Sequence, residues 1–131
     1  MKKFTSRLLK RAKTLRMGDG LKNTTDLGPL INEAQRQKVL SYCKLGVEEG
    51  AKLLLGGNVY KKGYCRGGFF FEPTLFAGVS PKMRIAQEEI FGPVLSILEY
   101  KNLENAVEIV NDSKFGLSSA IYTRDVNRAF K

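Results

Sequence analysis

The chain has 131 residues, of which 43% are apolar and 27% are charged, a composition typical of one globular domain. No apolar run approaches the ~20 residues that a membrane-spanning helix needs, and we expect no membrane association. The sequence contains no histidine, which excludes a serine–histidine triad, a cysteine–histidine pair and any zinc site that needs imidazole. We therefore expect no metal site.

The net charge of +9 is concentrated at the amino terminus, because residues 1–16 hold seven basic side chains and no acidic one. The rest of the chain is nearly balanced, and it carries no RNA-binding or zinc-finger motif. We therefore expect no nucleic-acid partner. Two cysteines without a secretory signal favour a reducing compartment, and the expected location is the cytoplasm.

The first expected element is a helix over residues 4–16, with four apolar side chains at helical spacing on one face. These are Phe4, Leu8, Ala12 and Leu15. The segment can be an amphipathic helix that docks on a core, which is the favoured interpretation, a basic arm for nucleic acid or membrane, or a transit peptide. Gly18 and Gly20 end the helix, and a polar loop follows through Asp26.

The middle of the chain predicts one long helix and two strands. Asn32 has the character of an N-cap for a helix that ends near Gly50. The apolar stripe of this helix comprises Val39, Tyr42, Cys43 and Val47. Strands are expected at 51–55 and 69–76, the second at an edge or a bulge because it contains Pro73.

The last third of the chain predicts a βαβ unit. After a short helical turn within residues 84–93, the pattern indicates a strand at 94–100, a helix at 103–112 and a strand at 117–123. A right-handed crossover with parallel strands is the expected connection. Asp125 can cap a final helix. The predicted fold class is therefore α/β, with helices packed on a mainly parallel open sheet.

Few residues of the sequence by themselves indicate a catalytic or ligand-binding role. Cys43 is expected to be a small core side chain, and Cys65 an inert loop thiol, although its basic neighbours could make it reactive. Glu88 and Glu89 stand just before Phe91 and a Gly-Pro turn, where a carboxylate could accept hydrogen bonds from a diol. A solvated acid pair beside a core phenylalanine explains the same residues.

Several segments together resemble the aldehyde dehydrogenase superfamily. The Glu-x-Phe-Gly-Pro signature lies within residues 85–94 and is flanked by four further matching segments in the family's order. These are residues 26–31, 48–57, 71–75 and 115–119. The resemblance implies oxidation of an aldehyde to a carboxylic acid with NAD or NADP as the cofactor. The aldehyde substrate would bind the complete enzyme.

The resemblance also implies roles for individual residues. Glu89 matches the glutamate that binds the hydroxyls of the nicotinamide ribose, and Phe91 matches the phenylalanine beside the nicotinamide end. Gln35 and Lys38 match positions that can approach the same ribose. Leu117 falls where a leucine lines the nicotinamide pocket.

The same resemblance indicates what the chain does not supply. The family's nucleophilic cysteine, its general base and its Rossmann domain match nothing here, so no catalytic residue is assigned and the chain alone is expected to be inactive. We interpret residues 1–131 as a single partial domain, from the C-terminal part of the catalytic domain, which self-associates or docks to the rest of the subunit. The alternative is a non-catalytic truncated paralogue, or a split-gene chain, that binds a partner subunit.

Overall fold

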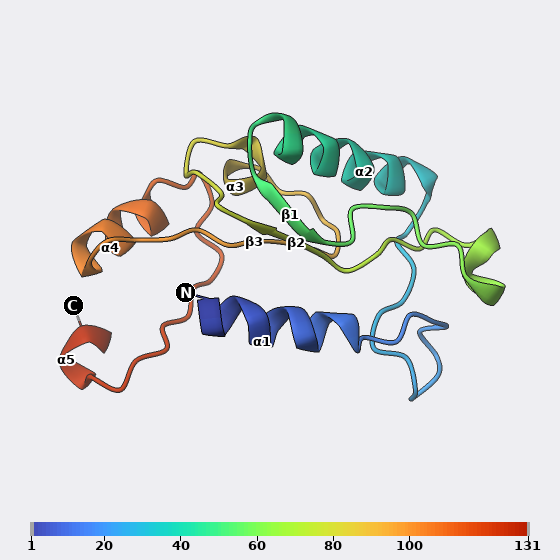
Figure 1. Cartoon of the computed structure of the whole chain (residues 1–131), viewed down its shortest axis with the longest axis horizontal. Helices are drawn as coiled ribbons and strands as arrows, with labels where there is room; N and C mark the ends of the chain where they lie inside the picture. Colours follow the sequence, from blue (N-terminus) through green and yellow to red (C-terminus); the bar gives the residue numbers. More distant parts are fainter. Residues whose placement is uncertain (1, 131) are drawn as a thin grey trace. The chain divides into compact units, whose positions relative to one another are not determined.

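The computed structural model describes residues 2–130, which form two compact units, the first ending at Glu99 and the second beginning at Tyr100. Figure 1 traces the elements in chain order. The first unit contains α1 (Lys2–Lys13), α2 (Glu33–Glu48), β1 (Lys52–Leu55), the 3₁₀ turn η1 (Gly63–Gly67), β2 (Thr74–Ala77), α3 (Arg84–Gln87) and β3 (Val94–Ser96). The second contains α4 (Leu103–Asn111) and α5 (Val126–Ala129).

The three strands form one small mixed sheet in the order β1-β2-β3. β1 pairs antiparallel with β2, with Leu53 opposite Phe76 and a register shift between Leu53 and Leu55. β2 pairs parallel with β3, with Leu75 opposite Leu95. The parallel pair is joined by the α3 turn and the loop that follows it. The expected α/β class is confirmed.

Helices lie on both faces of this sheet (Figure 1). α2 and α3 cover one face, and the core between them and the sheet is built from large side chains that are almost fully buried. It includes Val39, Cys43, Phe71, Phe76, Ile85 and Ile90. A Cβ atom at Gly46 of α2 would lie 2.9 Å from the Ile85 side chain, so a glycine permits the close contact of α2 with α3.

α1 lies on the opposite face of the sheet, against β1. Ala12 is buried and Leu8 and Leu15 are half-buried, as the amphipathic pattern predicted, whereas Phe4 is 60% exposed. The helix ends at Lys13, where the Thr14 hydroxyl donates to the Arg11 carbonyl over 2.8 Å.

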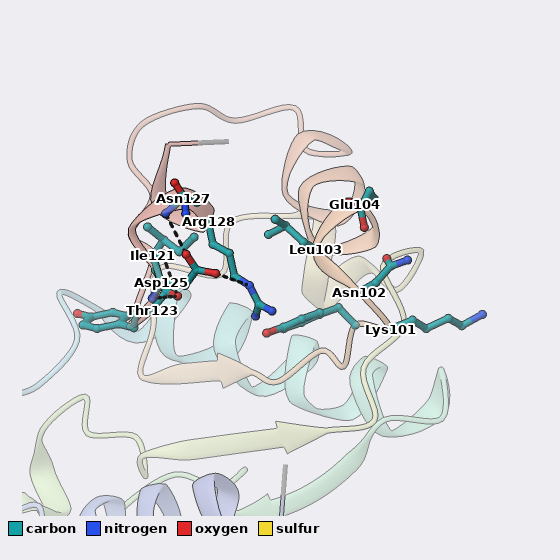
Figure 2. Close-up of a pocket in the computed structure, with 11 residues that line it drawn as sticks. Lys101, Asn102, Leu103, Glu104, Ile121, Thr123, Asp125, Asn127 and Arg128 are labelled. Atoms are coloured by element: carbon teal, nitrogen blue, oxygen red, sulfur yellow. Dashed lines mark hydrogen bonds and ion pairs between the residues drawn. The ribbon is translucent and has the colours of Figure 1, made fainter.

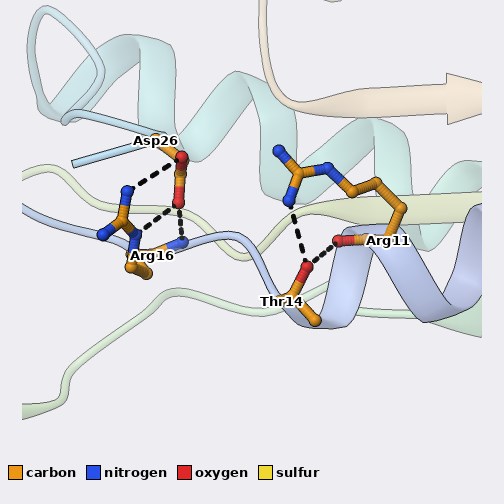
Figure 3. Close-up of polar contacts among 4 residues, drawn as sticks. All are labelled: Arg11, Thr14, Arg16 and Asp26. Atoms are coloured by element: carbon orange, nitrogen blue, oxygen red, sulfur yellow. Dashed lines mark hydrogen bonds and ion pairs between the residues drawn. The ribbon is translucent and has the colours of Figure 1, made fainter. Parts of the chain in front are cut away.

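The polar loop after α1 is closed by one ion pair, which Figure 3 shows. Nε of Arg16 donates to Oδ2 of Asp26 over 2.8 Å, and the Arg16 amide donates to the same oxygen over 2.9 Å. These hydrogen bonds lower the pKa of Asp26 to about 2. The loop thus returns to its starting point, and residues 17 and 27 form an isolated bridge.

α2 confirms the capping prediction. The Asn32 side chain accepts a hydrogen bond from the Gln35 amide over 2.8 Å, and the helix runs to Glu48. Its stripe is buried at Val39 and Cys43, while Val47 is 50% exposed. Gly50, with φ of +97°, takes the left-handed conformation that a helix end favours in glycine.

The predicted βαβ unit is wrong. β3 is shorter than expected, α4 forms as predicted, and residues 117–123 are irregular. In this segment Leu117 is 94% exposed and Tyr122 is 97% exposed. An apolar strand is stable only where a neighbouring strand supplies hydrogen bonds and a packing surface, and within residues 2–130 no strand pairs with this segment. The expected cap of the last helix is present, because Asp125 accepts from the Asn127 amide over 3.0 Å.

Candidate functional site

After α3, the Glu-x-Phe-Gly-Pro segment forms a partly exposed loop in which the Ile90 side chain is buried in the core. α3 ends at Gln87, and the backbone of Glu88 is already extended. Ile90 points into the core with 9% exposure, whereas the Phe91 ring is 73% exposed. Phe91 has φ of +55° and is the one non-glycine residue with positive φ in the part of the chain that the structure describes. Bulky side chains rarely adopt this conformation, so contacts around residues 89–91 must hold it.

Two side chains of α2 supply those contacts. The Gln35 amide nitrogen donates to the carbonyl of Ile90 over 2.7 Å and to that of Phe91 over 2.9 Å. Nζ of Lys38 donates to the carbonyl of Glu89 over 2.9 Å. Three successive carbonyl oxygens of the loop therefore accept hydrogen bonds from one face of one helix. We call Gln35 and Lys38 the α2 clamp and residues 89–91 the clamped loop.

Gly92 brings the same loop into direct contact with α2. A Cβ atom at this position would lie 2.4 Å from Cγ2 and 3.0 Å from Cγ1 of Val39, which is fully buried. No side chain fits such a distance without movement of the loop or the helix. The glycine of the motif is therefore required by packing. Gly92 and Pro93 also line a small hollow of about 300 Å³, together with Phe71 and residues 27–30.

The two glutamates of the motif have different environments. The Glu88 carboxylate accepts a hydrogen bond from the Tyr42 hydroxyl and a two-pronged contact from Arg84, at 2.8 and 3.0 Å. The hydrogen bond to Glu88 raises the pKa of Tyr42, because it favours the protonated phenol. Glu88 therefore joins α2 to α3 and has a structural role. Glu89 is exposed, and its main-chain carbonyl is the group that Lys38 binds.

Four of the five sequence-predicted site residues therefore gather in the first unit: Gln35, Lys38, Glu89 and Phe91. Leu117 lies in the second unit, and its side chain is almost fully exposed. Sequence reasoning did not anticipate Tyr42, Arg84 or Val39 as supports of the loop. Residue spacing could have indicated Tyr42. It follows Lys38 by one turn of α2 and so lies on the same side of the helix as the clamp.

The second unit has a hollow of its own, shown in Figure 2. It measures about 610 Å³ and is lined mainly by exposed side chains of residues 100–104 and 121–128. Arg128 forms an ion pair with Asp125 at its wall, at 3.4 Å. None of the predicted site residues lines it. We therefore place the candidate site at the clamped loop.

Both cysteines are free thiols and are buried. Cys43 is 3% exposed, and its burial raises the pKa of the thiol to about 11. Cys65, in η1, is 2% exposed. A thiol needs exposure and thiolate character to act as a nucleophile, so this environment supports the expectation that neither is catalytic.

Residues 2–130 offer neither a metal-binding cluster nor a membrane-spanning helix. No three or more Cys, Asp or Glu side chains in this range are placed to hold a metal ion. None of the helices described has the length and apolar character that crossing a bilayer requires.

The α/β layer, the clamped loop and its Glu-x-Phe-Gly-Pro motif together define one class of protein. Residues 1–131 match the aldehyde dehydrogenase family along their whole length. The chain belongs to this family.

The relatives that resemble this chain include two betaine aldehyde dehydrogenases. The chain is 45% identical over 129 residues to betaine aldehyde dehydrogenase of Mesorhizobium japonicum, covering 98% of this chain and 26% of that protein. It is 48% identical over 126 residues to betaine aldehyde dehydrogenase of Brucella ovis, covering 96% and 26%. The chain therefore spans about a quarter of the length of these relatives.

Solved structures agree with the fold. Betaine aldehyde dehydrogenase of Staphylococcus aureus in complex with NAD⁺ superposes with a TM-score of 0.95 at 35% identity, covering 98% of this chain and 26% of that one. NAD-dependent aldehyde dehydrogenase of Sinorhizobium meliloti gives 0.92 at 41% identity, covering 98% and 25%.

Proposed function

We propose that this chain is the part of an NAD(P)-dependent aldehyde dehydrogenase catalytic domain that holds the nicotinamide ribose of the cofactor. The complete enzyme would oxidise an aldehyde to a carboxylic acid. Family membership supports the reaction class, and NAD⁺ in the related solved structures supports the cofactor class. The observation that carries the proposal is the exposed Glu89 side chain on a loop whose backbone is fixed at three consecutive carbonyls.

The residues present fit the ribose end of a dinucleotide. A carboxylate offers two acceptor oxygens, which match the two hydroxyls of a ribose, and charge-assisted hydrogen bonds of this kind are stronger than neutral ones. Within residues 2–130, no hydrogen bond or ion pair described uses the Glu89 carboxylate, so it is available to a ligand. The exposed Phe91 ring, two residues on, can cover a flat heterocycle.

The remaining residues of the site take supporting parts in this proposal. Gln35 and Lys38 lie next to Glu89 through the clamped loop, and Leu117 would line the nicotinamide pocket in the complete subunit. When bound, the cofactor supplies the hydride acceptor. This chain's residues fix where the ribose sits, and orientation of that kind contributes to the rate as well as to binding.

The catalytic thiol and the general base would come from outside these 131 residues. The burial of Cys43 and Cys65 supports this division of roles. The 131-residue chain by itself is therefore expected to be inactive. It would need to dock to the rest of the catalytic domain, or would self-associate.

A non-catalytic chain that binds a partner subunit is the second candidate. The observation that favours it is the exposure of apolar strand residues, with Leu53 38% exposed and Leu95 48% exposed. Buried sheets are normally covered on both faces, so such side chains suit a docking surface. Under this alternative, substitution of Glu89 would leave the function of the assembly unchanged.

The experiment replaces Glu89 by glutamine in the complete enzyme that carries this segment. The amide keeps the shape, loses the charge and turns one acceptor into a donor. We expect cofactor affinity to fall by about 5- to 150-fold, or about 1–3 kcal/mol, measured by titration of NAD⁺ and NADP⁺.

The matched control is Glu88→Gln. Its carboxylate is already bound by Tyr42 and Arg84, so this change should weaken the α2–α3 contact and leave the cofactor contact largely intact. If Glu88→Gln impairs cofactor binding while Glu89→Gln binds and turns over like the wild type, the proposed role of Glu89 is wrong.

A further inference from the structure

We propose that Gln35 is a positioning residue that acts on the cofactor through the clamped loop: it holds the strained backbone of Phe91 and so directs Glu89 and Phe91 outward. This inference rests on the proposed function. It differs from the resemblance-based expectation, in which Gln35 approaches the ribose itself. Lys38 assists the clamp with one further hydrogen bond.

The hydrogen-bonding capacity of Gln35 supports this assignment. A glutamine amide has two N–H donors, and both neighbours of its nitrogen are carbonyl oxygens, those of Ile90 and Phe91. The nitrogen must therefore face the loop, and its two donors are used there. Only the side-chain oxygen remains, which can accept a hydrogen bond, so Gln35 has no donor left for a ribose oxygen or a phosphate.

The backbone at Phe91 explains why a clamp is needed. A phenylalanine with φ of +55° is strained, because its Cβ lies close to the neighbouring carbonyl oxygen. The residue is 73% exposed, so packing of its side chain gives little to offset that strain. The two hydrogen bonds from Gln35 fall on the carbonyls before and after the strained φ angle. They therefore act on the conformation that would otherwise relax.

The consequence is that Gln35 controls the direction of the functional side chains. With Ile90 fixed in the core, rotation about the backbone of residues 89–91 is the motion left to the loop. That rotation would carry the Glu89 carboxylate and the Phe91 ring away from a shared ligand. Loss of the clamp should thus lower both cofactor affinity and turnover, without a direct contact to the cofactor.

The test compares Gln35→Met with Gln37→Met in the complete enzyme. Methionine keeps the length and helix propensity of glutamine and removes its donors. Gln37 lies on the same helix, is exposed, and donates over 2.6 Å to Glu33 within α2. It therefore controls for the loss of an amide from α2 without any change at the clamped loop.

The first measurement is chymotrypsin cleavage of the Phe91–Gly92 bond in the absence of cofactor. Cleavage within a folded protein follows the population of the locally open form. Loss of two hydrogen bonds should raise the cleavage rate of Gln35→Met by about 10- to 100-fold, and Gln37→Met should match the wild type. The second measurement is steady-state kinetics, where KM for NAD⁺ should rise and kcat fall while KM for the aldehyde stays constant.

The outcomes separate the clamp from its alternatives. If Gln35→Met is cleaved at the wild-type rate without cofactor, the clamp is refuted, and a loss of affinity would then mean a direct ligand contact. If Gln35→Met does not fold, Lys38→Met removes one hydrogen bond and should still raise cleavage about 2- to 10-fold; an unchanged rate refutes the clamp. If Gln35→Met opens the loop but Glu89→Gln leaves cofactor affinity unchanged, the proposed function fails and the structural clamp stands.

Discussion

Replacement of Gly92 by alanine should destabilise the fold and displace the clamped loop, because the backbone of this glycine packs directly against Val39 of α2. The new Cβ would lie 2.4 Å from Cγ2 of Val39, whereas carbon atoms in contact are normally about 3.5–4.0 Å apart. Val39 has no exposed surface and is held by the core around it. Relief of the overlap therefore requires the loop to move outward by about 1 Å.

The expected cost follows from that displacement. A shift of ~1 Å would stretch the Gln35 hydrogen bonds, now 2.7 and 2.9 Å, to the limit of hydrogen bonding or beyond it. Overpacking costs about 1–3 kcal/mol, and each lost hydrogen bond about 0.5–1.5 kcal/mol. We expect Gly92→Ala to lower the free energy of unfolding by about 2–6 kcal/mol, measured by urea denaturation, and to weaken NAD⁺ binding in the complete enzyme.

A double-mutant cycle tests the cause. Val39→Ala removes the two nearest carbons that the new Cβ would meet, so Val39→Ala with Gly92→Ala should cost about 1–2 kcal/mol less than the two single changes added together. The control is Gly20→Ala, because a Cβ atom at Gly20 would have only its chain neighbours within 4 Å, and this change should stay within about 0.5 kcal/mol of wild type. Additive effects in the cycle, or a Gly92→Ala protein as stable as the wild type, would refute the packing argument.

Two further predictions concern the ion pair and the thiols. Because Arg16 lowers the pKa of Asp26 from 3.8 to about 2, the pair stabilises the fold above pH ~3.8 and the contribution is lost as the pH falls towards 2; unfolding measured across this range should show the loss, and Asp26→Asn should remove it. A pH dependence unchanged by Asp26→Asn would show that other carboxylates control acid unfolding. Cys43 and Cys65 should react with a thiol reagent at pH ~8 only after denaturation, and fast modification of either in the native protein would contradict its burial.

The helices were predicted correctly from local sequence patterns, namely capping residues and the spacing of apolar side chains. Asn32 accepts a hydrogen bond from the amide three residues on, as predicted for the N-cap of this helix, and the helix expected at 103–112 forms as α4 behind a similar cap at Asn102. These features depend on residues only a few positions apart, so the sequence alone contains the information. The Glu-x-Phe-Gly-Pro segment was identified as a functional site through its resemblance to the aldehyde dehydrogenase superfamily, because its residues alone are equally explained by a solvated acid pair.

Tertiary structure decided what supports that segment and how its two glutamates differ. The contact of Gln35 with Ile90 joins residues 55 positions apart, and that of Tyr42 with Glu88 joins residues 46 apart, which no local pattern specifies. In residues 117–123, a local pattern predicted an element that the tertiary structure does not form. Their apolar pattern predicted a strand, but a strand forms only when a neighbouring strand satisfies its backbone hydrogen bonds, and within residues 2–130 none does so. Strand formation depends on distant partners, whereas helix hydrogen bonds are local, and this physical difference separates what the sequence predicted from what the fold decided.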